Sequence, residues 1–409
     1  MNAILLTSPL ERRPRLRLLA LSSDTFPPWR VDVSVLFGEE IAHRGHTVDW
    51  LLQSEAECAH PRLVSWGGGR VWVAPADRGT TRLRRLRNHL LDVRNDLRLF
   101  ALLKRGRYDA IEVKDKFLAG LFAILAARWH DKRFLYWLSF PLPEFYLSRA
   151  RDGTARYPLL YRLRGLACGC LLYRVLLRAA DHVFVQSEQM RRDVVARGIA
   201  PAKLTVVPMG ISRAAIAGPR EGPRADGARR RIPAGERCVV YLGALGRERR
   251  IDFLLRVLAR VHRELPDAKL YLVGHAACAE DERFLAEEAR RMELASSVVF
   301  VGALPRAAAL EYVQDADVCV SPLPPAPLLN CGSPTKLVEY MAMGKAVVAN
   351  THPEQQLLIG ESGCGYCVPY EEGPFARSIV ALLGAPELAR SMGERGRRYI
   401  LEHLSLIHI

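Results

Sequence analysis

A lysine and a glutamate stand on one short segment near the C-terminal end of the chain, SPTKLVEYMAMGKAVVAN, residues 333–350. Ser333 and Pro334 are typical of a helix start, and Gly344 is typical of a helix end. A helix start presents free backbone N–H groups and the positive end of the helix dipole, which together favour bound phosphate. The segment therefore predicts a phosphate site formed by backbone amides around residues 333–336.

Glu339 supplies the second chemical group of this helix. It would lie about 9 Å along the axis from Ser333, and helical side chains lean toward the helix start. Its carboxylate could accept hydrogen bonds from a diol that lies beyond a phosphate bound at that start. A nucleoside diphosphate presents this pair of groups, a diphosphate followed by ribose hydroxyls. The alternative is an ordinary half-buried glutamate paired with Lys336, one turn earlier on the helix.

The elements that would position this helix follow a repeating order of strand and helix. Short apolar runs such as residues 16–23 and 269–274 end at polar residues or glycine, as buried parallel strands do, and helical periodicity follows them. Residues 217–236 are rich in Pro, Gly and Arg and predict a linker. We predict an α/β fold of two doubly wound, Rossmann-like domains, residues 15–216 and 237–385, that face each other across a cleft.

The two ends of the chain carry separate expectations. We expect an N-terminal extension at residues 1–14 and a C-terminal helical segment at 386–403 that is cut short. The basic run near the start follows a short apolar stretch instead of preceding it, which does not fit a signal peptide. Residues 404–409, LSLIHI, match the translated end of an adapter used to prepare sequencing libraries, so we expect them to be an artefact.

The net charge of +15 calls for an acidic partner, which could be nucleic acid, an anionic membrane surface or a phosphorylated substrate. The sequence shows no recognised nucleic-acid motif, so we expect no nucleic-acid partner. No apolar run reaches the ~18 residues of a membrane span, which predicts a soluble or peripheral protein. The nine cysteines are scattered, and the single C-x-x-C pair, Cys364 and Cys367, has no second pair to complete a zinc site. We expect no metal and a reducing, cytoplasmic compartment.

Several segments resemble, in the same order, those of the family 4, group 1 glycosyltransferases of GT-B fold. They are RGHTVDW, residues 178–212, YLGALGRERRIDFLLRVLARV, KLYLVG, residues 298–322 and the segment that holds SPTK and EYMA. The resemblance covers roughly residues 16–403 and is far more specific than any one motif. It implies a metal-independent, retaining hexosyltransferase that needs no cofactor and takes a UDP- or GDP-sugar as donor. The implied acceptor is a glycan or polyprenyl-linked sugar in bacterial surface polysaccharide or lipopolysaccharide assembly, reached in the cytoplasm or on the inner face of the plasma membrane.

The resemblance also implies roles for individual residues. Glu339 matches the second of two family glutamates and would bind the donor ribose, whereas Cys331 stands where the first is usual. In the first loop of the second domain, Ala244 stands where the family has an arginine, and Arg249 where it has a lysine. We expect Arg249 and Arg247 to stabilise the leaving diphosphate, as catalytic residues beside Glu339. The expected donor contacts are Gly243, Gly274, Ser333, Thr335, Lys336, Leu337 and Glu339.

The acceptor side departs further from the family. The histidine that usually touches the transferred sugar is missing from FLYWLSFPLPE, and PPWRVD replaces the usual pair of glycines in the first loop. We expect the acceptor to contact Arg30, Asp32 or Glu144. Because these groups differ, two alternatives stay open: a nucleotide-sugar epimerase of the same fold, and an inactive scaffold that binds the donor.

Two stretches, Thr81–Arg107 and Tyr157–Ala180, combine leucines at helical spacing with many arginines. They predict either helices whose leucines face a core and whose basic sides are solvated, or a surface that dips into anionic lipid. Asp315 and Asp317 mimic a D-x-D metal motif, but their place between a helix and a strand favours a capping role.

Overall fold

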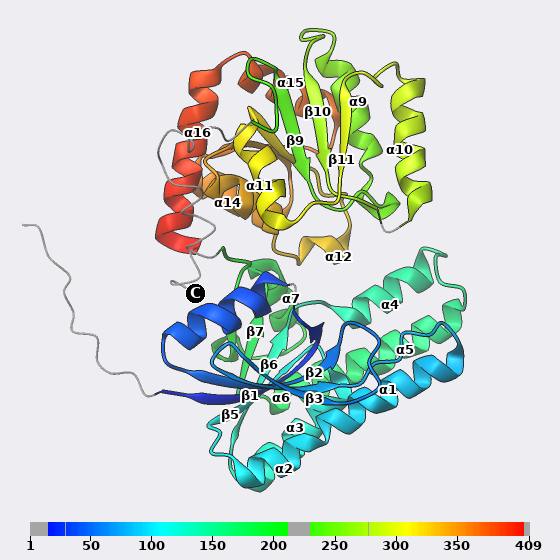
Figure 1. Cartoon of the computed structure of the whole chain (residues 1–409), viewed down its shortest axis with the longest axis vertical. Coiled ribbons are helices and arrows are strands. Elements are labelled where there is room, and N and C mark those ends of the chain that lie inside the picture. The colour runs from blue at the N-terminus through cyan, green and yellow to red at the C-terminus, as the bar shows by residue number, and fades with distance from the viewer. Residues whose placement is uncertain (1–14, 29, 212–229, 277, 405–409) are drawn as a thin grey trace, which may run out of the picture. The chain divides into compact units, whose positions relative to one another are not determined.

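The computed structural model describes residues 15–28, 30–211, 230–276 and 278–404 (Figure 1). The expected N-terminal extension at 1–14, residues 217–229 of the expected linker and residues 405–409 lie outside this part of the chain. Among the described residues, no helix is both long enough and apolar enough to cross a membrane.

The first sheet has eight strands in the order β3-β4-β2-β1-β5-β6-β7-β8. Strand β1 pairs in parallel with both β2 and β5, whereas β3 and β4 form an antiparallel hairpin at one edge. The strands are β1 (Arg17–Phe26), β2 (Thr47–Ser54), β3 (Arg62–Trp66), β4 (Gly69–Ala74), β5 (Ala110–Lys114), β6 (Arg133–Leu138), β7 (His182–Val185) and β8 (Leu204–Val206). The helical segments are η1 (Asp32–Ile41), α1 (Arg82–Asp96), α2 (Arg98–Arg105), α3 (Phe117–His130), α4 (Leu142–Arg151), α5 (Pro158–Cys170), η2 (Leu171–Leu176), α6 (Leu177–Ala179), α7 (Glu188–Ala196) and η3 (Pro201–Lys203).

The second sheet has six strands in the order β11-β10-β9-β12-β13-β14, and its neighbouring strands run parallel. The strands are β9 (Cys238–Leu242), β10 (Lys269–Val273), β11 (Val298–Gly302), β12 (Val318–Ser321), β13 (Ala346–Asn350) and β14 (Gly365–Val368). The helical segments are η4 (Arg247–Arg249), α9 (Asp252–Val261), α10 (Ala279–Arg291), α11 (Arg306–Asp315), α12 (Pro327–Asn330), α13 (Thr335–Ala342), α14 (Pro353–Ser362), α15 (Glu372–Leu383), α16 (Pro386–Tyr399) and η5 (Ile400–Leu404).

Helices cover both faces of the second sheet, which explains its continuous apolar strands (Figure 1). All five residues of β13, AVVAN, are buried. One apolar cluster packs α9 and α15 against the sheet, and a separate cluster packs α11 and α13. The prediction of two α/β domains with parallel sheets is therefore confirmed.

The chain divides into two compact units. One comprises the described residues up to 139 together with 166–184 and 202–204, and the other comprises 140–165, 185–201 and the described residues from 205 onward. Because the chain passes between the units more than once, the domain limits placed at residues 216 and 236 stay a prediction.

Candidate functional site

The helix expected to bind phosphate is α13. It begins at Thr335, with Pro334 as the N-cap residue, and no side chain caps it. Ser333 is therefore not the N-cap, and the helix has eight residues where about ten were expected. The correction follows from the backbone of Pro334, which has a ψ of 85° and is not helical. The first amides of the helix have no preceding turn to accept them, so the anion-binding character of this start remains.

Two glycines form the sheet edge that belongs with this helix. Gly243 follows β9 with a φ of 150°, and Gly274 follows β10 with a φ of 140°. A Cβ atom on Gly274 would lie 2.0 Å from the carbonyl oxygen of Gly243, so only glycine fits. The Leu242 amide donates to Tyr340 Oη over 2.8 Å, which ties α13 to the end of β9. Ligands of parallel α/β sheets bind at this carboxyl edge.

Lys336 extends from the first turn of α13 to this edge. Its Nζ donates a hydrogen bond to Tyr241 Oη over 3.0 Å and lies 4.1 Å from the centroid of the Tyr241 ring. A Cβ atom on Gly243 would lie 3.2 Å from the same Nζ. Burial of the ammonium group and, next, the positive charge of Arg249 lower the pKa of Lys336 to about 7. A bound anion would raise the pKa of this lysine again and so favour its charged form.

Glu339 lies one turn further along α13 and is 9% exposed. Arg306, the first residue of α11, donates from Nε to Glu339 Oε1 over 3.0 Å. Burial raises the pKa of Glu339, and the charge of Arg306 opposes that rise. Glu339 and Lys336 act on each other electrostatically, but hydrogen bonds join Glu339 to Arg306 and Lys336 to Tyr241. The assignment of Glu339 to a ribose stays a prediction. Neither Arg306 nor Tyr241 was expected from the sequence, since both are distant from α13 along the chain.

The two arginines expected to act on the leaving group are separated by the structure. Arg247 donates from Nε to Asp281 Oδ1 over 3.0 Å, and its guanidinium lies 4.6 Å from the Phe284 ring centroid. It is thus bound to α10. Arg249 acts electrostatically on Lys336 and Tyr241. The charge of Arg249 is thus felt at Lys336 on α13, and the roles of Arg249 and Arg247 at the leaving group stay predictions.

Cys331 takes the place of the missing glutamate. It is buried, and its thiol donates to the Leu328 carbonyl oxygen over 3.0 Å. Burial raises the pKa of Cys331 to about 12, so the thiol is neutral and does not replace a carboxylate. The D-x-D mimic has a structural role, because Asp317 accepts from the Cys238 amide over 2.9 Å and Asp315 from the Arg231 amide over 2.6 Å.

The residues expected to contact an acceptor are held in ion pairs. Asp32 is 5% exposed and contacts Arg30 Nη2 at 2.8 Å and Lys114 Nζ at 2.9 Å. Lys114 also contacts Asp24 at 2.9 Å. Burial alone would raise the pKa of Asp32, but the charges of Lys114 and Arg30 lower it. Glu144, in the first turn of α4, pairs with Arg197 at 2.9 Å. Their contact with an acceptor therefore stays a prediction, and it would require these pairs to open or share a carboxylate oxygen.

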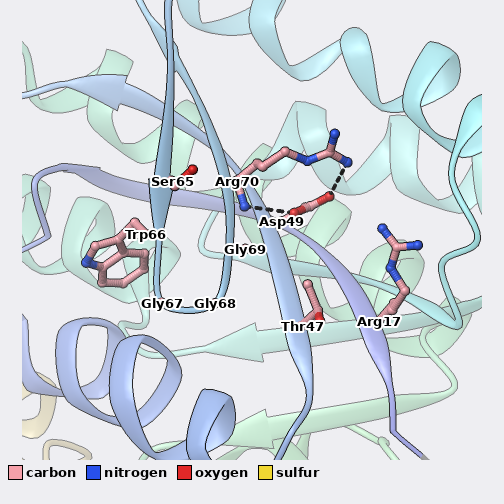
Figure 2. A pocket seen from close by; sticks show the side chains of 9 residues that line it. All are labelled: Arg17, Thr47, Asp49, Ser65, Trp66, Gly67, Gly68, Gly69 and Arg70. Carbon is pink, nitrogen blue, oxygen red and sulfur yellow. Dashed lines mark hydrogen bonds and ion pairs between the residues drawn. The ribbon is translucent and has the colours of Figure 1, made fainter.

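A separate hollow of about 660 Å³ lies beside the β3–β4 hairpin (Figure 2). It is lined by Arg17, Thr47, Asp49 and residues 65–70. Arg70 donates to Asp49 Oδ2 over 3.0 Å, and Tyr108 donates to the same oxygen over 2.6 Å. The hollow lies where β1 and β2 begin, at the end of the sheet opposite to the edge where such folds bind ligands. None of the expected site residues lines it.

Comparison with known proteins agrees with this geometry. Residues 236–385 match the family model described as glycosyl transferases group 1, and residues 35–210 match the glycosyl transferase 4-like domain. Alpha-monoglucosyldiacylglycerol synthase of Streptococcus pneumoniae is 25% identical over 295 residues, which are 70% of this chain and 62% of that protein.

Solved structures share the fold over nearly the whole chain. Sucrose-phosphate synthase from Thermosynechococcus elongatus has a TM-score of 0.68 and 20% identity, and the match covers 96% of this chain and 95% of that one. HepE of Anabaena, solved in complex with UDP, has a TM-score of 0.65 and 14% identity, with 96% of each chain covered. The predicted GT-B fold is confirmed.

Proposed function

Because the chain belongs to the group 1 glycosyltransferases, we propose that it is a retaining, metal-independent hexosyltransferase that uses a UDP- or GDP-sugar. The observation that carries the proposal is the position of Lys336, which lies beside Gly243 at the carboxyl edge of the second sheet, one turn before Glu339 on the same helix. The UDP in the structure of Anabaena HepE supports a uridine donor.

The groups of the donor would lie along α13 in the order of its residues. Its diphosphate would occupy the start of α13 and the glycine edge, where Lys336 and Arg249 supply positive charge. Its ribose hydroxyls would donate to Glu339, which would share its carboxylate with Arg306. Cations and backbone amides would then do for the phosphates what a metal ion does in other transferases.

The chemical step follows from this charge distribution. The bond between the sugar's anomeric carbon and the terminal phosphate oxygen breaks, and negative charge develops on that oxygen. Lys336 and Arg249 would stabilise the charge where it forms. The acceptor hydroxyl attacks the anomeric carbon from the same face and passes its proton to the departing phosphate. The step therefore needs no separate protein base.

The acceptor we propose is a glycan or a lipid-linked sugar used in bacterial surface polysaccharide assembly. The S. pneumoniae relative is named for a glycolipid product, which supports a lipid acceptor. We further propose that the protein acts in the cytoplasm, peripherally on the inner face of the plasma membrane, where such acceptors are accessible.

A thermal-shift panel of UDP-, GDP- and ADP-sugars tests the donor, and product analysis with the stabilising donor tests turnover. We expect sugar transfer that withstands EDTA and is lost in Glu339→Gln and Arg249→Ala. Conversion of the donor sugar without any acceptor would instead identify an epimerase. Donor binding without turnover would identify a scaffold, which the neutral Cys331 thiol and the absence of a cation at Ala244 would then explain.

A further inference from the structure

Helix α1 presents its polar side to the protein. It packs against β2, β4 and α3. Asn95 Nδ2 donates to the carbonyl oxygens of Leu52 over 3.2 Å and Trp72 over 3.0 Å. Asp96, which follows Asn95, and Asp92, about one turn earlier, accept from Lys116 Nζ over 2.7 Å and 2.9 Å. These inward residues recur at helical spacing, so the packed side of α1 is held by hydrogen bonds and ion pairs.

The opposite side of α1 is apolar and faces solvent. Leu83, Leu86 and Leu90 are 80%, 56% and 58% exposed, and Leu97 continues the stripe just after the helix. Their spacing of three, four and seven residues places them on one side of the helix. The expectation that the leucines face a core is therefore wrong for α1. An amphipathic helix normally buries its apolar side, so this orientation is unusual for a protein surface in water. The same expectation is also wrong for α5, whose leucines Leu159, Leu160, Leu163 and Leu166 are exposed, and right for the buried Leu172, Leu176 and Leu177 that follow.

The charges of α1 around the leucines are mainly positive, and part of that charge is paired: Asp77 lies 3.4 Å from Arg84 and 3.8 Å from Arg87. All five arginines of α1 are exposed: Arg82, Arg84, Arg85, Arg87 and Arg94. The two carboxylates of the helix, Asp92 and Asp96, point inward to Lys116. By helical spacing Arg82, Arg87 and Arg94 flank the leucines, so the outward side of α1 combines leucine with arginine and carries no carboxylate from α1 itself.

Neighbouring α3 repeats the pattern. It exposes Leu118, Leu125 and Trp129, which are spaced at seven and four residues and share one side of the helix. Trp129 is 80% exposed, and tryptophan is enriched where protein meets the boundary between lipid headgroups and water. The exposed apolar surface of the first sheet's helices is thus not confined to α1.

We propose that the outward side of α1, defined by Leu83, Leu86, Leu90 and Leu97, binds the surface of an anionic lipid bilayer. The leucines would enter the boundary between headgroups and acyl chains, and the flanking Arg82, Arg87 and Arg94 would contact the lipid phosphates. The chain's net charge of +15 favours the same partner. This inference adds to the proposed function, because a protein bound to the membrane would meet a lipid-linked acceptor there. Vesicle binding itself needs neither donor nor acceptor, so it can be tested separately.

Vesicle flotation tests the proposal with the full chain. Vesicles of phosphatidylcholine alone are compared with vesicles that also contain phosphatidylglycerol, at low and high salt. The variant Leu83→Gln/Leu86→Gln/Leu90→Gln keeps the net charge. The matched control, Leu357→Gln/Leu388→Gln/Leu401→Gln, changes three exposed leucines that lie on α14, α16 and η5. Circular dichroism and thermal unfolding confirm that both variants fold.

We expect the wild type and the control to float with phosphatidylglycerol vesicles, more weakly at high salt, and the α1 variant to lose at least about tenfold in vesicle affinity. Three results would overturn the proposal: no flotation of the wild type, equal flotation of the α1 variant, or equal binding to uncharged vesicles. A dimer that the α1 substitutions dissociate, without vesicle binding, would also overturn it and assign the leucines to a second copy of the chain. Thermal stabilisation by UDP is measured in parallel. It shows whether the proposed donor site is right or wrong, whatever the result of vesicle binding.

Discussion

Lys336 Nζ lies 3.0 Å from Tyr241 Oη, so a cation from α13 stands at the end of β9. In the loop that follows β9, Ala244 is exposed and carries no charge where the family has an arginine. Lys336 therefore offers from the helix the positive charge that the loop lacks. This relationship makes Lys336, with Arg249, the central residue of the proposed diphosphate site.

Replacing Lys336 with methionine should lower the affinity for UDP by roughly tenfold to a hundredfold, because a charge-assisted hydrogen bond is lost. Isothermal titration calorimetry measures the change. Lys345→Met is the matched control, since Lys345 is also half-buried, has a lowered pKa and donates to the Ala316 carbonyl oxygen over 2.9 Å. It lies beyond the far end of α13. Equal losses in both variants would show a general effect on folding and would remove Lys336 from the site.

UDP binding should take up a proton near pH 8. The pKa of Lys336 is about 7 in the free protein, so the amine is largely neutral at pH 8. The negative charge of a bound diphosphate would raise that pKa, and the amine would then take up a proton from solvent. The phosphate groups of UDP are already ionised at this pH, because the second pKa of a phosphate is about 6. UDP affinity should fall as pH rises above about 7, by up to tenfold per unit. Calorimetry in buffers of different ionisation enthalpy measures the uptake, and Lys336→Met should abolish it.

The lowered pKa of Lys336 also makes the free energy of unfolding depend on pH. Between about pH 7 and 10.5 the unfolded chain holds the Lys336 proton and the folded chain does not, so this lysine makes the folded state more stable as pH rises through that window. In thermal unfolding without ligand, Lys336→Met should remove this part of the pH dependence. An unchanged pH profile would mean that Lys336 keeps its charge in the folded protein.

Glu339→Gln should weaken UDP binding by at least about tenfold and leave the binding of pyrophosphate unchanged, because the carboxylate is assigned to the ribose. Lys336→Met should weaken both ligands. Competition of UDP and pyrophosphate against a fluorescent nucleotide measures this difference. If Glu339→Gln weakened pyrophosphate equally, the carboxylate would act through the fold or through the charge of Arg306, and its assignment to the ribose would be lost.

Gly274→Ala should abolish UDP binding and lower the melting temperature by several degrees. The new Cβ atom would lie 2.0 Å from the Gly243 carbonyl oxygen, at a φ of 140° that alanine rarely adopts. Gly360→Ala on α14 is the control, because a Cβ atom there meets nothing within 4 Å. That variant should melt at or slightly above the wild-type temperature. Normal UDP binding by Gly274→Ala would show that the β10 end tolerates a side chain.

The sequence was sufficient for the parallel strands and for the position of Glu339 on α13, but not for the antiparallel β3–β4 hairpin at the edge of the first sheet. Apolar runs such as β13 have the length and composition of buried parallel strands, and the helix signals around α13 were misplaced by one residue only. The contacts between elements could not be obtained in this way. Arg306 reaches Glu339 from 33 residues away, and no local pattern marks an arginine that will do so.

Periodicity likewise gave the amphipathic character of α1 but not its orientation. Asn95 and Asp96 follow the same helical period as the leucines, on the opposite side. Which side packs inward was decided by Lys116 and by the Leu52 and Trp72 carbonyl oxygens, all of which lie elsewhere in the chain. A polar side is buried only where such partners satisfy it.

The position of Lys336 has a consequence for how such chains change over time. Lys336 depends on two other residues, Tyr241 and Gly243. A side chain at position 243 would contact the lysine amine, and phenylalanine at position 241 would remove its hydrogen-bond acceptor. At position 244 the backbone carbonyl oxygen accepts from the Tyr241 hydroxyl over 3.0 Å, a contact that any residue type could supply. We expect substitutions in related genes to accumulate in the loop, while positions 241, 243 and 336 change together or not at all.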